Sequence, residues 1–99
     1  MLEIGMGDVY RNSVKIVGDV LRIADESGTG GVNLTALLRK ANLSYSRLAN
    51  VALKLMEAGL IDEQVQEGQR IYTITSRGRD YLRRYQQFAE IADSFGLKL

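Results

Sequence analysis

The stretch NLSYSRLANVALKLMEAG, from Asn42 to Gly59, decides how this chain folds. Asn42 tolerates the left-handed backbone conformation that ends a helix, and Ser44 is a good N-cap for a new one. From there apolar residues recur at helical spacing as far as Gly59, a residue type that terminates many helices. The stretch therefore predicts a tight turn that carries an inward-facing Leu43, followed by a helix over about 44–58.

Two further helices are expected before this turn. The first begins near Val14, with Asp8 or Ser13 as its N-cap, and ends before a glycine-rich turn. The second is short, covers 34–41, and has Asn33 as its N-cap. Two helices joined by a turn of about three residues are typical of a helix-turn-helix.

After Gly59 the periodicity of the sequence changes. Residues 60–66 and 69–75 read as strands, the second of them alternating and β-branched, and the Glu67-Gly68 pair between them is a turn signal. These segments are expected to form a β-hairpin, which must pack on the helices because an isolated hairpin is marginal in water. From 76 to about 95 the spacing is helical again, so the predicted fold class is mainly α with one small β-hairpin.

Length and composition limit the chain to one modest domain. With 99 residues, 45% of them hydrophobic and 25% charged, it has the composition of a folded globular domain. We assign residues 1–99 to this domain, with a core over 13–75 and a long last helix over 76–96. The sequence contains no Cys and no His, so the usual thiolate nucleophile, general base and zinc ligands are missing. We therefore expect no enzyme activity, no cofactor and no metal ion.

Targeting signals are also missing from the sequence. No apolar run reaches the roughly 20 residues that a membrane span requires. No basic and then apolar start marks a signal peptide. The expectation is a soluble, cytoplasmic domain without a membrane partner.

The net charge of +1 hides an uneven distribution of basic residues. Residues 39–56 include four basic residues and no acid, and residues 69–84 include five basic residues and one acid, Asp80. If the fold brings these two blocks together, they form a face for a polyanion. The alternative is that they are solvated helix faces, which is the expected state of Arg83 and Arg84.

Three strings carry a resemblance to a known family: ANLSYSRL at 41–48, EAGLI at 57–61 and YTITSRGRDYL at 72–82. With the element order above, they resemble small archaeal winged helix-turn-helix proteins, over about residues 13–95. That family includes an abundant ten-kilodalton chromatin-associated type and a set of predicted transcriptional regulators. The resemblance implies that the hairpin is a wing, that the partner is double-stranded DNA, and that the last helix pairs with its counterpart in an antiparallel coiled coil.

The geometry of DNA indicates which residues to expect at such a surface. The major groove, about 12 Å wide, admits one α-helix, and the second helix of a helix-turn-helix enters it with its N-terminal side chains at base edges. We therefore predict that the helix over 44–58 reads the groove and that the hairpin over 60–75 touches flanking DNA. Asn50 can form two hydrogen bonds with adenine, and Arg47 with guanine. The expected DNA contacts are Arg39, Lys40, Ser44, Tyr45, Ser46, Arg47, Asn50, Lys54, Gln69 and Arg70.

Some of these residues also have a purely structural interpretation. Ser44 is expected to cap its helix whatever else it does. Tyr45 is as able to pack on the helix-turn-helix as to contact DNA, and Asn50 can be a solvated helix residue. The sequence leaves these alternatives open.

The last helix is longer than a core of this size can cover. Twenty residues span about 30 Å, and the helix, capped by Thr75 or Ser76, carries one apolar stripe rich in aromatic side chains. Exposed apolar stripes usually mark an interface, so we expect a homodimer with a coiled coil. The alternative is that the start of the helix packs on the first helix of its own domain. The expected interface residues are Tyr81, Leu82, Tyr85, Phe88, Ala89, Ala92 and Phe95.

Together these features predict a dimeric, sequence-preferring DNA-binding protein that acts as a transcriptional regulator. One alternative is a chromatin-associated architectural protein, although a net charge of +1 is low for a protein that coats DNA. A second alternative is a winged helix that binds another protein and not DNA, because folds are reused for different functions.

Overall fold

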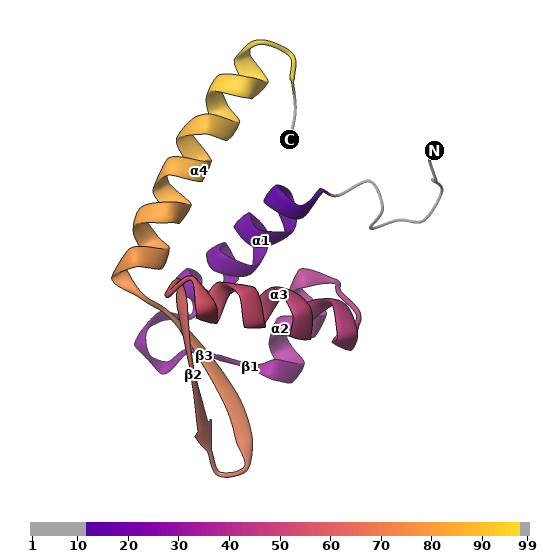
Figure 1. Ribbon diagram of the computed structural model, residues 1–99, viewed down its shortest axis with the longest axis vertical. Helices are drawn as coiled ribbons and strands as arrows, with labels where there is room; N and C mark the ends of the chain where they lie inside the picture. The colour runs from indigo at the N-terminus through magenta and orange to yellow at the C-terminus, as the bar shows by residue number, and fades with distance from the viewer. Residues whose placement is uncertain (1–11, 98–99) are drawn as a thin grey trace.

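The computed structural model describes residues 12–97 and shows a mainly helical chain with a small antiparallel sheet (Figure 1). Helices α1, α2 and α3 form the body of the molecule, the β2–β3 hairpin projects from one end, and α4 extends from the other. The predicted order of three helices, a hairpin and a long helix is confirmed. The elements are α1 (Ser13–Glu26), the 3₁₀ turn η2 (Gly28–Gly30), β1 (Val32–Asn33), α2 (Leu34–Ala41), α3 (Tyr45–Glu57), β2 (Ile61–Gln66), β3 (Gln69–Ile74) and α4 (Ser76–Ser94).

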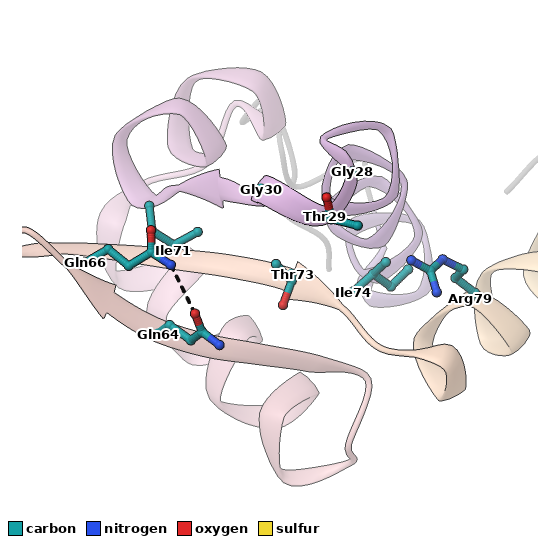
Figure 2. A pocket seen from close by; sticks show the side chains of 9 residues that line it. All are labelled: Gly28, Thr29, Gly30, Gln64, Gln66, Ile71, Thr73, Ile74 and Arg79. Carbon is teal, nitrogen blue, oxygen red and sulfur yellow. Dashed lines mark hydrogen bonds between the residues drawn. The ribbon is translucent and has the colours of Figure 1, made fainter.

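The sheet contains a third strand that the sequence analysis missed. Val32 pairs with Tyr72, and Asn33 with Ile71, so that β3 lies between β1 and β2 (Figure 2). Two residues are too few to show an alternating pattern, which is why β1 could not be recognised. The strand attaches the base of the hairpin to the helical body.

Most of the predicted helix caps are present. The side-chain oxygen of Asn33 accepts a hydrogen bond from the amide of Ala36 at 2.8 Å, and that of Ser44 accepts one from Arg47 at 3.2 Å. Asn42 ends α2 in the left-handed conformation, with φ of 55°. These caps fix the turn between α2 and α3, as the sequence predicted.

The cap of α1 differs from the expectation. Asn12 is the N-cap, and its side chain accepts a hydrogen bond from the amide of Lys15 at 2.8 Å. Ser13 is the first residue inside the helix and therefore does not cap it. Asp8, the other candidate, lies outside the described residues.

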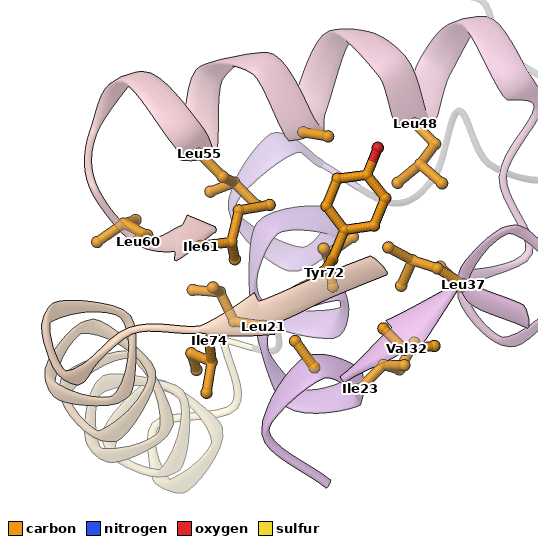
Figure 3. Close-up of a cluster of buried hydrophobic side chains, with 14 of the residues drawn as sticks. Leu21, Ile23, Val32, Leu37, Leu48, Leu55, Leu60, Ile61, Tyr72 and Ile74 are labelled. Atoms are coloured by element: carbon orange, nitrogen blue, oxygen red, sulfur yellow. The ribbon is translucent and has the colours of Figure 1, made fainter. Parts of the chain in front are cut away.

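The hydrophobic core lies where the three body helices meet the sheet (Figure 3). Helix α3 contributes Leu48 and Leu55, which are 0% and 3% exposed, and the ring of Tyr72 reaches them from β3. Burial of leucine-sized side chains contributes about 1.5–3 kcal/mol each. The core therefore holds α3 and the hairpin in one fixed relation.

The loop between α3 and β2 contacts the start of α4 at Leu60, and we call this contact the crossing. Gly59 turns the chain with φ of 76°, and the carbonyl oxygen of Leu60 accepts a hydrogen bond from the amide of Thr75 at 3.1 Å. The Thr75 hydroxyl donates to the carbonyl oxygen of Gly59 at 2.7 Å and accepts from the amide of Gly78 at 2.9 Å. A Cβ on Gly78 would lie 2.1 Å from the Leu60 oxygen. Only glycine permits this approach.

Helix α4 is divided into a supported half and an unsupported half. Leu82 is buried in the core of its own domain, and the ring of Tyr85 lies against Gly18 of α1, where a Cβ would be 2.4 Å from the ring. Farther along, Phe88 and Phe95 are 54% and 75% exposed. The first half of the helix thus packs on α1, as the alternative prediction stated, while the second half extends past it.

The crossing predicts that Gly78→Ala is destabilising. The added methyl group collides with backbone, and the roughly 1 kcal/mol gained in helix propensity offsets only part of the strain. We expect the free energy of unfolding to fall by about 2 kcal/mol or more, measured by urea denaturation.

Gly30→Ala is the matched control for this substitution. No atom lies within 4 Å of a Cβ at Gly30, so its effect should stay within about 0.5 kcal/mol. Equal stability of the two variants would contradict the close approach at Leu60.

Candidate nucleic-acid interface

The outer face of α3 carries four exposed side chains in one line. Ser46, Asn50, Leu53 and Glu57 follow one another at intervals of four, three and four residues, which places them on one side of the helix. We call these four residues the outer line of α3. Within residues 12–97, the side chains of Ser46 and Asn50 have no hydrogen-bond partner. They are therefore available to an external ligand.

The predicted basic residues of α3 lie on the flank that faces α1. Arg47, Asn50 and Lys54 line a pocket of about 110 Å³ together with Ser13, Ile16 and Val17 of α1. Arg47 and Lys54 are thus beside the outer line and not on it, while Asn50 belongs to both. This flank presents positive charge parallel to the outer line.

The other flank of α3 faces the hairpin. Tyr45 is 55% exposed and lines a pocket of about 320 Å³ between the start of α2, the start of α3 and the hairpin tip. Gln69 and Arg70 line the same pocket, so the fold brings three of the predicted DNA contacts together from distant positions in the sequence. The complete lining is Asn33, Leu34, Thr35, Tyr45, Gly68, Gln69 and Arg70.

A polar network beneath this pocket orients Arg70. Tyr72, which is 3% exposed, donates a hydrogen bond from its hydroxyl to the Glu63 carboxylate at 2.7 Å. Burial, with this hydrogen bond, raises the pKa of Tyr72 to about 12. The neighbouring Tyr72 side chain raises the pKa of Arg70 above its usual value, with Tyr45 and Glu63 adding to the effect. Arg70 is therefore held at the side of the hairpin that faces α3.

Sequence reasoning missed Glu63 and Tyr72, although a signal was present. The Glu67-Gly68 turn, with φ of 52° and 78°, fixes Gln66 opposite Gln69. Counting back along both strands then places Glu63 opposite Tyr72. Opposite residues in an antiparallel pair share a face, so their contact followed from the turn alone.

The remaining predicted contacts lie at the α2–α3 turn. Arg39 and Lys40 are exposed in the last turn of α2, where positive charge also complements the helix dipole. Ser44 uses its hydroxyl as the cap of α3, in agreement with its structural interpretation. Arg39, Lys40 and Lys54 form no ion pair within the described part of the chain.

Three of the four arginines of α4 are paired with acids. Arg83 and Arg84 both contact Asp80, and the Arg84 Nε lies 3.1 Å from a carboxylate oxygen. Arg79 lies 3.4 Å from Asp25 of α1. Three of the five basic residues of the second block therefore have an acidic partner.

A third pocket, of about 300 Å³, lies beside the hairpin near η2 (Figure 2). Gln64 and Gln66, joined by a 3.1 Å hydrogen bond, form one side, and Thr29 lies on the other. None of the predicted DNA contacts lines it. In residues 12–97 no cluster of acidic side chains could hold a metal ion, and no helix is long and apolar enough to cross a membrane.

Comparison with known proteins identifies the fold. A family model described as winged helix-turn-helix matches residues 10–93. No curated protein sequence matches the chain.

Several solved structures have the same arrangement. Sso10a-2 of Sulfolobus solfataricus, described as a DNA-binding protein, is 20% identical, with a TM-score of 0.77 over 86% of this chain and 85% of its own. A MarR-family transcriptional regulator from Rhodococcus sp. RHA1 is 22% identical, with a TM-score of 0.73 over 79% of this chain and 56% of its own. A mutant of Staphylococcus aureus MepR bound to an oligodeoxyribonucleotide is 15% identical, with a TM-score of 0.68 over 85% and 64%. These likenesses concern the fold.

The raised pKa of Tyr72 predicts a loss of stability at high pH. Its ionised form is disfavoured in the folded protein, so the stability that the group contributes is complete below pH 10 and is lost as the pH rises towards 12. The Tyr72→Phe variant cannot ionise at this position. Across this pH range the free energy of unfolding of the wild-type protein should therefore fall by on the order of 2 kcal/mol more than that of the variant. Urea denaturation of both proteins at matched pH measures the difference, and parallel pH profiles would contradict it.

Proposed function

Because the chain belongs to the winged helix-turn-helix family, we propose that it binds double-stranded DNA as a dimeric, sequence-preferring transcriptional regulator. Helix α3 enters the major groove, and the β2–β3 hairpin is the wing that touches flanking DNA. The observation that carries this proposal is the outer line of α3, with free Ser46 and Asn50 side chains between a basic flank and the wing.

The two flanks of α3 match the two phosphate backbones that border a major groove. Arg47 and Lys54 on the α1 side meet one backbone, and Tyr45, Gln69 and Arg70 on the wing side meet the other. Such contacts position a protein without reading sequence. A helix held between them presents its outer line to the base edges, where Asn50 pairs with adenine.

Known proteins of the same shape support a nucleic-acid ligand. Sso10a-2 is a DNA-binding protein, and MepR has been seen bound to an oligodeoxyribonucleotide. The low net charge of +1 favours a site-preferring regulator over an architectural protein that coats DNA. A protein-binding module would not require four basic residues and no acid in residues 39–56.

The exposed half of α4 supports the dimer. Phe88, Ile91 and Phe95 are 54%, 56% and 75% exposed. The first two belong to the second half of α4, and Phe95 is its C-cap. This end of the helix extends past its own domain (Figure 1). Aromatic side chains of this size bury large areas at interfaces. A second copy of α4 covers them, and Leu82, which is buried in its own core, is not needed for the contact. The dimer presents two α3 helices to two related half-sites.

DNA binding is tested with a double charge reversal on the basic flank. Fluorescence anisotropy with a random duplex of about 30 base pairs should detect wild-type binding that weakens steeply with salt, with a logarithmic slope of about −5 to −7 for a dimer. Arg47→Glu with Lys54→Glu should abolish this binding, because repulsion replaces attraction at the phosphates.

The matched control reverses the charge of two arginines on α4. Arg83→Glu with Arg84→Glu changes the net charge by the same amount, at side chains 63% and 74% exposed that already face Asp80. This variant should keep most of the affinity. Retained binding by the α3 variant would refute the proposed interface, whereas absence of binding by the wild-type protein would favour a protein partner.

The dimer is tested by placing charge in the apolar stripe. Sedimentation equilibrium should give the wild-type protein twice the 11.0 kDa mass of one chain. Phe88→Asp with Ile91→Asp should give monomers, because burying unpaired carboxylates in an interface is costly. Gln86→Asp, two residues from Phe88 and so on another side of α4, should remain dimeric. A monomeric wild type would refute the dimer.

A further inference from the structure

Leu53 is the apolar member of the outer line of α3. Its side chain is 52% exposed, and it lies three residues after Asn50 and four before Glu57. A lone exposed leucine is common on protein surfaces and carries no meaning by itself. Here, however, it lies on the face that the proposed function turns towards the base pairs.

The core of the protein gives no reason for a leucine at this position. Leu48, Ala52 and Leu55 form the buried side of α3, and Leu53 is absent from the cluster that they belong to. Helix propensity gives no reason either, since arginine, lysine and glutamine form helices about as well. An external contact therefore accounts best for the apolar side chain.

Only one base presents an apolar group in the major groove. Thymine carries a C5-methyl group there, whereas the other bases present hydrogen-bond donors and acceptors. A leucine against those polar groups removes them from water without replacing their hydrogen bonds, which is unfavourable. A leucine against the thymine methyl group buries two apolar surfaces.

We infer that Leu53 is a specificity-determining residue that selects thymine through its C5-methyl group. The inference rests on the proposed function. Asn50 and Leu53 are separated by about 4.5 Å along the helix axis, close to the rise of one base pair, about 3.4 Å. The two residues therefore read neighbouring base pairs, adenine with Asn50 and thymine with Leu53. The target contains A·T pairs at the centre of each half-site.

Glu57 marks the end of this reading surface. Its carboxylate is exposed one turn beyond Leu53 and repels phosphate groups. The C-terminal end of α3 is therefore held away from the DNA backbone. Leu53 is the last residue of the outer line that lies close to the bases.

The test compares two duplexes that differ only in methyl groups. One is an alternating A·T duplex of about 30 base pairs, and the other has uracil at every thymine position, so that base pairing is kept. Fluorescence anisotropy at one low salt concentration gives the ratio of the two dissociation constants. The wild-type protein should bind the thymine duplex about fourfold more tightly for each methyl group contacted, or about sixteenfold for a dimer with two contacts.

Two variants show whether Leu53 causes the difference. Leu53→Ala changes an exposed position, so the variant should fold normally. Because the apolar contact is removed, its ratio of dissociation constants for the two duplexes should fall to about one. Val14→Ala is the matched control, since Val14 is an apolar residue 43% exposed on α1, and its ratio of dissociation constants should equal that of the wild type. Circular dichroism of both variants verifies folding.

Each other outcome overturns a defined statement. Binding of both duplexes with equal affinity by the wild-type protein overturns the inference and leaves the proposed function intact. A ratio that persists in Leu53→Ala assigns the methyl effect to DNA shape and also overturns the inference. Failure to bind either duplex overturns the proposed function and the inference together.

Discussion

The carbonyl oxygen of Leu60 is the point on which the arrangement of the molecule depends. It accepts a hydrogen bond from the amide of Thr75. It also lies so close to Gly78 that any side chain at position 78 would collide with it. Three elements meet there, because α3 has just ended, β2 is about to begin, and α4 starts on the other side of the contact. The Thr75 hydroxyl completes the crossing by joining Gly59 to Gly78. The directions of the hairpin and of α4 relative to α3 are both set at this crossing.

Tyr72 connects the hydrophobic core to the proposed DNA surface. Its ring packs in the core near Leu48 of α3 (Figure 3). Its hydroxyl donates a hydrogen bond to Glu63 of β2, and Arg70 of β3 lies nearby. One side chain thus fixes the spacing between α3 and the wing and also orients a cation on the wing. Because the hydroxyl is buried, leaving it without a partner would cost about 1–3 kcal/mol, which keeps the network closed.

Helix α4 shows how one amphipathic stripe serves two purposes. Near its start, Leu82 and Tyr85 pack on the body, and the absence of a side chain at Gly18 lets α1 and α4 approach closely. Beyond that contact the same stripe continues as Phe88 and Phe95, which no part of the described domain covers. A small domain has too little surface to cover a helix of 19 residues, so its far half is left for another molecule.

The sequence by itself determined the local structure of this protein. Caps at Asn33 and Ser44, the left-handed Asn42 and the Glu67-Gly68 turn each act within four residues, so their chemistry can be read directly from the chain. These signals gave the order of the elements and the residues of the α3 surface. The three strings at 41–48, 57–61 and 72–82 indicated the family as well.

Only the tertiary structure decided which side chains of these elements contact one another and which remain exposed. It placed Arg47 and Lys54 on a flank beside α1, brought Tyr45 next to Arg70, and divided the stripe of α4 between core and surface. It also added β1, whose two residues form a strand only because β3 lies beside them. Periodicity states which side of a helix is apolar, but the partner of that side depends on contacts between distant residues. Such contacts are set by packing of the whole chain and leave no local pattern in the sequence.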